Sequence, residues 1–114
     1  MQLRKTYKNI NPELLYDEMQ DFILKQGATL GERKLETYSL PGGSSHISRA
    51  TLTFKMPTQG GKAEKECIRV HIVGSAVGET KMELDIDEKL FLPANKSALE
   101  EDLDFIFGSY EVRQ

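Results

Sequence analysis

Two histidines and one cysteine are the side chains of this sequence most readily used for catalysis or metal binding. They are His46, His71 and Cys67, and their spacing gives no CxxC, HxH or HExxH motif. The sequence therefore predicts no metal site and no cofactor. Cys67 would share a strand face with Arg69 and His71, and a thiolate next to these cations could be reactive. The alternative is a small apolar side chain in a strand.

The segment 66–91 predicts a β-hairpin that would position Cys67 and His71. Apolar and polar residues alternate on both sides of a turn that is bounded by glycines. One register pairs Ile72 with Met82, Val70 with Leu84, Ile68 with Ile86, Arg69 with Asp85 and His71 with Glu83. A slip of one residue would break both the apolar pairs and the pairs of opposite charge, so the register is well specified. The last pair could support proton transfer at the histidine, or form a structural ion pair across the strands.

Two helices and three more strands are expected around this hairpin. The first helix starts at Asn11-Pro12, a capping residue followed by a proline that fits the first helical position, and it ends at Gly27. The second helix is predicted over Ser97–Phe107, because Ser97 and Glu100 have the spacing of a capping box. The other strands are predicted over residues 3–10, 33–40 and 46–56, with a turn at 41–45 between the last two.

The predicted order β-α-β-β-β-β-α defines an α+β fold in which an antiparallel sheet carries both helices on one face. This order is similar to one half of a TATA-box-binding protein and to the helix-grip group of Bet v 1-like and START-like domains. The stretch Tyr7–Tyr16, YKNINPELLY, resembles the step from first strand to first helix in the helix-grip group. That group has more strands and a longer last helix. The resemblance implies an apolar groove between sheet and helices, and it carries over no catalytic residue.

Two functions are compatible with this arrangement. The first is a small non-enzymatic binding domain that holds an apolar or amphipathic ligand, and its groove would be lined by Met19, Phe22, Phe54, Met56, Met82, Ile106 and Phe107. The same side chains could instead simply fill the core.

The second function is an interaction module that binds a protein or a second copy of itself, through an edge strand or the polar face of the sheet. That face would present Arg49, Thr51, Thr53, Lys55, Arg69, His71, Glu83 and Asp85. An enzyme ranks third, because the sequence shows no nucleophile or acid–base constellation.

Composition further limits the kinds of protein and partner that fit this sequence. The chain has 114 residues, 39% of them hydrophobic and 29% charged, as expected for one globular domain over residues 1–114. A net charge of −3 argues against a nucleic-acid partner, which would require a basic surface. There is no apolar run of about 20 residues to span a membrane and no apolar core of a signal peptide near Met1. With a single cysteine, the expected location is the cytoplasm.

Overall fold

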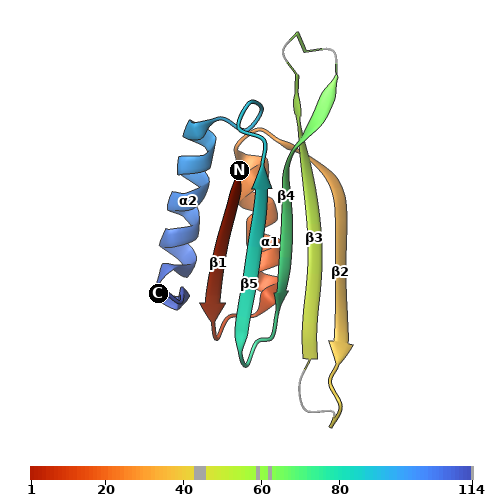
Figure 1. The fold of residues 1–114 in the computed structure, drawn as a ribbon, viewed down its shortest axis with the longest axis vertical. Coiled ribbons are helices and arrows are strands. Elements are labelled where there is room, and N and C mark those ends of the chain that lie inside the picture. Colours follow the sequence, from red (N-terminus) through yellow and green to blue (C-terminus); the bar gives the residue numbers. More distant parts are fainter. Residues whose placement is uncertain (43–45, 59, 62, 114) are drawn as a thin grey trace.

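The computed structural model describes residues 1–42, 46–58, 60–61 and 63–113, and its core is a five-stranded antiparallel sheet (Figure 1). The elements are β1 (Gln2–Lys8), α1 (Pro12–Lys25), β2 (Thr29–Ser39), β3 (His46–Pro57), β4 (Glu64–Gly74), β5 (Glu79–Ile86), α2 (Pro93–Phe107) and a 3-10 turn (Gly108–Tyr110). The strands lie in the order β1-β5-β4-β3-β2. The predicted α+β class and element order are confirmed. Of the predicted turn at 41–45, residues 43–45 lie outside the described part of the chain.

The register predicted for the central hairpin is confirmed. Ile72 lies opposite Met82, and Arg69 lies opposite Asp85. The strand β1 then pairs along the other side of β5, so that the sheet is a meander of β2 to β5 extended by β1. The alternation of residues is thus enough to fix these strands, because one face of each is buried.

Helix α1 begins as predicted. The side-chain Oδ1 of Asn11 accepts the backbone N–H of Glu13 at 2.9 Å, and Pro12 is the first helical residue. After the helix, Gly27 has a φ of +96°, which is a conformation that glycine adopts without strain. One face of α1 is buried against the sheet, including Leu15, Met19 and Ile23 in successive turns.

Helix α2 begins at Pro93, earlier than the predicted start at Ser97. The predicted start is wrong because the fixed φ of proline suits the first turn of a helix as well as a break between elements. The side chain of Asn95 reaches back to accept the backbone N–H of Leu92 at 3.3 Å, which satisfies one free group at the helix start. Leu99 and Leu103 then follow one buried face.

A single hydrophobic core lies between the sheet and the two helices. The helices are joined to each other by an ion pair between Lys25 and Asp102 at 3.2 Å, and by a hydrogen bond from Asn95 to Gln26, also at 3.2 Å. Buried apolar side chains come from both helices and from β1, β3, β4 and β5, whereas every described residue of β2 stays outside this core. Strand β2 is therefore held mainly by its hydrogen bonds to β3.

A β-bulge in β4 changes the position of the only cysteine. Phe54 of β3 pairs with Ile68 and Lys55 pairs with Glu66, which leaves Cys67 as an extra residue. An extra residue reverses the alternation of side chains, so Cys67 and Ile68 are both buried. The prediction that Cys67 shares a face with Arg69 and His71 is wrong for this reason.

Candidate interaction surface

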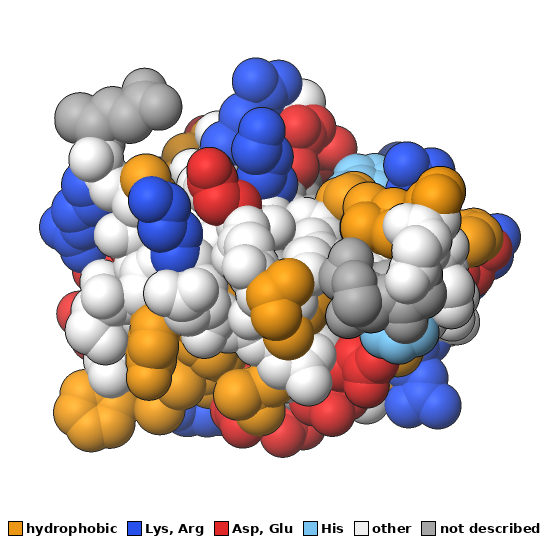
Figure 2. Space-filling view, turned by 90° about the horizontal axis from the view of Figure 1, so that it is seen from below, with side chains coloured by type: hydrophobic (Ala, Val, Ile, Leu, Met, Phe, Trp, Pro, Cys, Tyr) orange, Lys and Arg blue, Asp and Glu red, His pale blue; other side chains and the backbone are white. Residues whose placement is uncertain are grey.

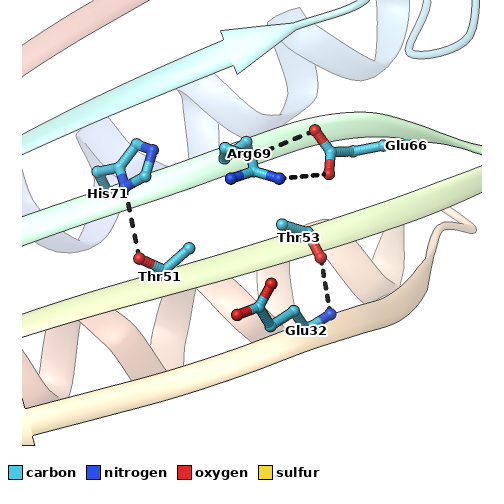
Figure 3. A network of polar contacts seen from close by, with 6 residues as sticks. All are labelled: Glu32, Thr51, Thr53, Glu66, Arg69 and His71. Carbon is cyan, nitrogen blue, oxygen red and sulfur yellow. Dashed lines mark hydrogen bonds and ion pairs between the residues drawn. The ribbon is translucent and has the colours of Figure 1, made fainter.

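The face of the sheet that the helices leave uncovered carries the polar side chains predicted for it. We call it the open face. Arg49 and Lys55 are exposed there, and the members on β4 and β5 are half-buried. Figure 3 shows that Thr51, Thr53, Arg69 and His71 project from the same side of β3 and β4, with the helices behind the sheet.

The histidine on this face does not form the predicted pair with a carboxylate. His71 lies opposite Glu83 in the strand register, but its ring Nδ1 is 3.4 Å from the hydroxyl of Thr51 (Figure 3). Glu83 instead forms an ion pair with Arg4 at 3.2 Å and accepts a hydrogen bond from Gln2. The carboxylate of Glu83 is therefore paired with Arg4 of β1. Among the described residues, His71 contacts the hydroxyl of Thr51 and no carboxylate.

The arginine predicted to face Asp85 also has a different partner. The guanidinium of Arg69 donates two hydrogen bonds to the carboxylate of Glu66, at 3.0 and 3.3 Å (Figure 3). These hydrogen bonds, followed by the negative charge of Glu66, raise the pKa of Arg69. Side chains two or three residues away along a strand can thus compete with the residue directly across it.

Thr53 belongs to the open face but is only 4% exposed. A second bulge, in β2, places Gly31 and Glu32 together opposite Thr53. The Thr53 hydroxyl accepts the backbone N–H of Glu32 at 2.7 Å (Figure 3). A Cβ atom at position 31 would lie 2.7 Å from the same oxygen, so the close contact requires glycine. The hydroxyl of Thr53 therefore fixes β2 on β3 and is not available to a partner.

Sequence reasoning missed the part of the open face that β1 contributes. An open hollow of about 690 Å³ lies over β1, β5 and β4, and its lining includes Arg4, Thr6, His71, Lys81 and Glu83. The alternation along residues 81–87 already placed Lys81 on this face. The position of Arg4 depends on the pairing of β1 with β5, which local sequence does not reveal.

Strand β2 is the second feature that sequence reasoning underestimated. It forms one edge of the sheet, and its side chains Leu30, Leu35 and Tyr38 are 37%, 39% and 49% exposed. On the open face Tyr38 lies opposite Ile47 of β3, so apolar surface there is continuous between two strands. Exposed apolar side chains on a sheet edge are typical of sites where another chain binds.

The two edges of the sheet are covered differently. On the β1 edge, the backbone N–H of Val112 donates to the carbonyl of Thr6 at 2.7 Å, and Tyr7 forms an isolated bridge with Glu111. Figure 1 also shows α2 alongside β1. Within the described part of the chain, no backbone hydrogen bond reaches the outer edge of β2. The backbone groups on that edge are therefore free to pair with another strand.

Charges near this edge lie close together. Lys34 and Glu36 point to the same face of β2 and form an ion pair at 3.2 Å. The hydroxyl of Tyr38 donates to Glu36, and this hydrogen bond, with a further contribution from Lys34, lowers the pKa of the Glu36 carboxyl. Glu36 is therefore ionised at neutral pH.

The charge of the whole molecule is divided between its two layers. The helices α1 and α2 carry eight acidic and two basic side chains, so they account for −6, and the remainder of the chain carries +3. Figure 2, viewed from the end where α1 begins, shows a row of acidic side chains along the lower rim, and lysine and arginine side chains together with a few acidic ones at the upper rim. A partner with acidic groups would thus be attracted to the sheet rather than to the helices.

The residues predicted to line an apolar groove are mostly packed in the core. Met19, Phe22, Phe54, Met82 and Phe107 are buried, and Met56 is partly buried against them. Ile106 is 44% exposed, because the buried face of α2 runs through Leu99, Leu103 and Phe107. The structure therefore brings five of the seven together as packed core residues and leaves Ile106 on the helix surface.

The remaining candidates for chemistry are separated or buried. Cys67 is 1% exposed, and burial raises the pKa of its thiol from 9.0 to about 11. Among the described residues, no three side chains of His, Cys, Asp or Glu gather as a metal site requires. None of the helices described is long and apolar enough to cross a membrane.

The fold and this surface define the class as an α+β protein with an open antiparallel sheet, of which one face and one edge are left uncovered by the described residues. No protein-family model matches the sequence, and no curated protein or solved structure was found to be significantly similar to it. The helix-grip resemblance therefore stays a prediction, and function must be argued from the surface itself.

Proposed function

We propose that this protein is a non-enzymatic interaction module that docks a protein partner at β2 and the adjoining open face of the sheet. The observation that carries the proposal is the difference between the two edges. The β1 edge is covered by residues near the C-terminus, whereas the edge of the 11-residue strand β2 has no backbone partner in the described part of the chain. A partner strand added there would satisfy these groups by β-augmentation.

Side chains around this edge support docking of a protein. Leu30, Leu35 and Tyr38 supply apolar surface, while Lys34 and Glu36 supply charges that can select a partner. Next to them, the open face has Arg49 exposed and Val73 38% exposed in one cross-strand pair. Apolar side chains surrounded by charges are a common composition for protein interfaces.

Photo-crosslinking from defined positions tests this proposal. A benzoylphenylalanine replaces Leu35 on β2 in one variant and Phe105, which is 88% exposed on α2, in the control. Both variants are expressed in the cells from which the protein comes. We expect a discrete cross-linked product from position 35 and none of the same mass from position 105. Equal products from both positions, or none from position 35, would contradict docking at β2.

A charge-reversal pair tests the contribution of the open face. Arg49→Glu combined with Arg69→Glu should reduce the yield of the product cross-linked at position 35, because both side chains lie on the open face near β2. Lys25→Glu combined with Lys96→Glu is the matched control, since it also reverses two cations but lies on the helix layer. Equal losses in both variants would show that the net charge of the protein matters and that the open face does not.

The small-ligand function remains a separate prediction with less support from the geometry, because most of the proposed lining is packed core. Native mass spectrometry of the purified protein tests it directly. A retained mass of a small molecule would favour the ligand, and a bare chain would favour the interaction module.

A further inference from the structure

The charges of β2 are arranged so that the strand can pair with its own copy. A cation, Lys34, and an anion, Glu36, lie at equal distances on either side of Leu35. From Arg33 to Ser39 the strand pairs regularly with β3, and its bulge lies before this stretch, between Leu30 and Arg33. Seven regular residues extend about 23 Å, which is the length of an ordinary strand. The charged residues of the stretch are Arg33, Lys34 and Glu36, with Leu35 between the last two.

Two identical strands that continue a sheet in antiparallel fashion are related by a two-fold axis perpendicular to the sheet. The residue on the axis then faces its own copy, and residues at equal distances before and after it face each other. All facing residues lie on the same side of the sheet, as in any antiparallel pair. A register between two copies of β2 is therefore defined by naming the residue on the axis.

Three of the seven axis positions from Arg33 to Ser39 oppose like charges. An axis at Arg33, at Lys34 or at Glu36 places that charge opposite its own copy. An axis at Thr37 brings no two charged residues together. An axis at Leu35 places Lys34 of each copy opposite Glu36 of the other and opposes no like charges.

We propose that β2 pairs with β2 of a second copy of this chain, antiparallel and with Leu35 on the two-fold axis, to form a continuous ten-stranded sheet. This inference rests on the proposed function, since it names the partner that docks at the free edge. The two Leu35 side chains, each 39% exposed in the monomer, contact each other on the face of the sheet that carries the helices. On the open face, the ion pair between Lys34 and Glu36 at 3.2 Å becomes a cluster of four alternating charges.

A charge swap tests the register. Lys34→Glu and Glu36→Lys each place two like-charged pairs across the axis, and the double variant Lys34→Glu/Glu36→Lys restores two opposite pairs. Sedimentation velocity over a range of concentrations measures the dissociation constant of the dimer, and circular dichroism checks the fold of each variant. We expect each single variant to weaken the dimer at least about tenfold and the double variant to return to within about threefold of the original.

A cysteine pair reports the axis independently. In a Cys67→Ala background, Leu35→Cys places two thiols directly opposite each other, about 5 Å apart at Cβ, and mild oxidation should yield a covalent dimer. Tyr38→Cys is the control, because in this register its two copies lie about 20 Å apart along the strands. Rapid covalent dimerisation at position 38 but not at 35 would overturn the register.

The outcomes separate the two proposals. If the protein is a monomer at every concentration, or if the charge swap fails to restore a dimer that the single variants weaken, self-pairing about Leu35 is wrong. A cross-linked product from position 35 that contains a different protein would then leave the docking function intact. Absence of both the dimer and the position-specific product would overturn both.

Discussion

The hydroxyl of Thr53 on β3 accepts the backbone N–H of Glu32 on β2 at 2.7 Å, and so holds the bulge that sets how the edge strand lies on the sheet. Replacement of Thr53 by Val keeps the shape of the side chain but removes the acceptor. Because the N–H of Glu32 is then left without its partner, we expect a loss of about 1–3 kcal/mol in the free energy of unfolding, measured in urea.

Thr51→Val is the matched control for this variant. Thr51 is half-buried on the same strand, and its hydroxyl contacts only the ring of His71 among the hydrogen bonds of the described residues. We expect its effect to stay within about 0.5 kcal/mol. If the two variants lose the same stability, the bulge hydrogen bond has no special role.

The cap of α1 gives a second prediction. Replacing Asn11 by Ala removes the oxygen that accepts the N–H of Glu13, so the free energy of unfolding should fall by about 0.5–2 kcal/mol. Asn11→Asp keeps an acceptor at the same place and should retain most of the stability. A denaturation midpoint for the alanine variant equal to that of the original protein would refute the cap.

The two faces of α2 should respond differently to truncation. Leu103 is fully buried and Ile106 is 44% exposed. Leu103→Ala should cost about 2–5 kcal/mol through lost burial and a residual cavity, whereas Ile106→Ala should cost less than about 1 kcal/mol. Thermal denaturation of both variants measures the difference. An equal cost at the two positions would contradict the orientation of the helix.

Burial of the Cys67 thiol predicts a decrease of stability at alkaline pH. Burial raises the pKa of this thiol in the folded protein from 9.0 to about 11. The unfolded chain therefore releases its proton first. Its stabilisation is fully present below pH 9 and is lost as the pH rises toward 11, by at most about 2–3 kcal/mol.

Urea denaturation between pH 8 and 11 measures this loss, with Cys67→Ala as the variant that should remove it. Burial raises the pKa of Tyr7 as well, so both proteins should carry Tyr7→Phe to eliminate the contribution of the tyrosine. A slope that is identical with and without the thiol would exclude Cys67 as its source.

The hydroxyl of Tyr7 gives a prediction with the opposite sign. Tyr7 is 1% exposed, its ring centroid lies 6.0 Å from that of Phe107, and its buried hydroxyl has no hydrogen-bond partner among the described residues. Tyr7→Phe should therefore leave the stability unchanged or increase it, because an unsatisfied polar group is removed while the packing of the ring is kept. A loss above about 1 kcal/mol would indicate a partner for the hydroxyl.

Local sequence was sufficient where a single physical rule acts over a few residues. Alternation of apolar and polar side chains predicted the pairing of β4 with β5, since a slip of one residue would move every apolar side chain to the open face. Asn11 and Pro12 predicted the start of α1, because capping depends on residues that are neighbours in the chain. The order of the elements followed from these patterns.

The tertiary structure alone decided which side chains meet and which edges stay free. The bulge at Cys67 depends on the pairing of β4 with β3, and it moved the thiol from the open face into the core. The partner of Glu83 is Arg4, which lies 79 residues earlier in the chain and reaches Glu83 only through the pairing of β1 with β5. By sequence, Pro93 fits either a break or a helix start. The structure shows a helix that begins at Pro93 and buries Leu99 and Leu103.

The candidate site follows the same division. The sequence by itself determined that β2 has charges of both signs around Leu35, and that the open face is polar. Only the fold showed that the β1 edge is covered near the C-terminus, while no backbone group of the described residues pairs with the outer edge of β2. The physical reason is that exposure is a property of what packs against a strand, and residues remote in sequence supply that cover.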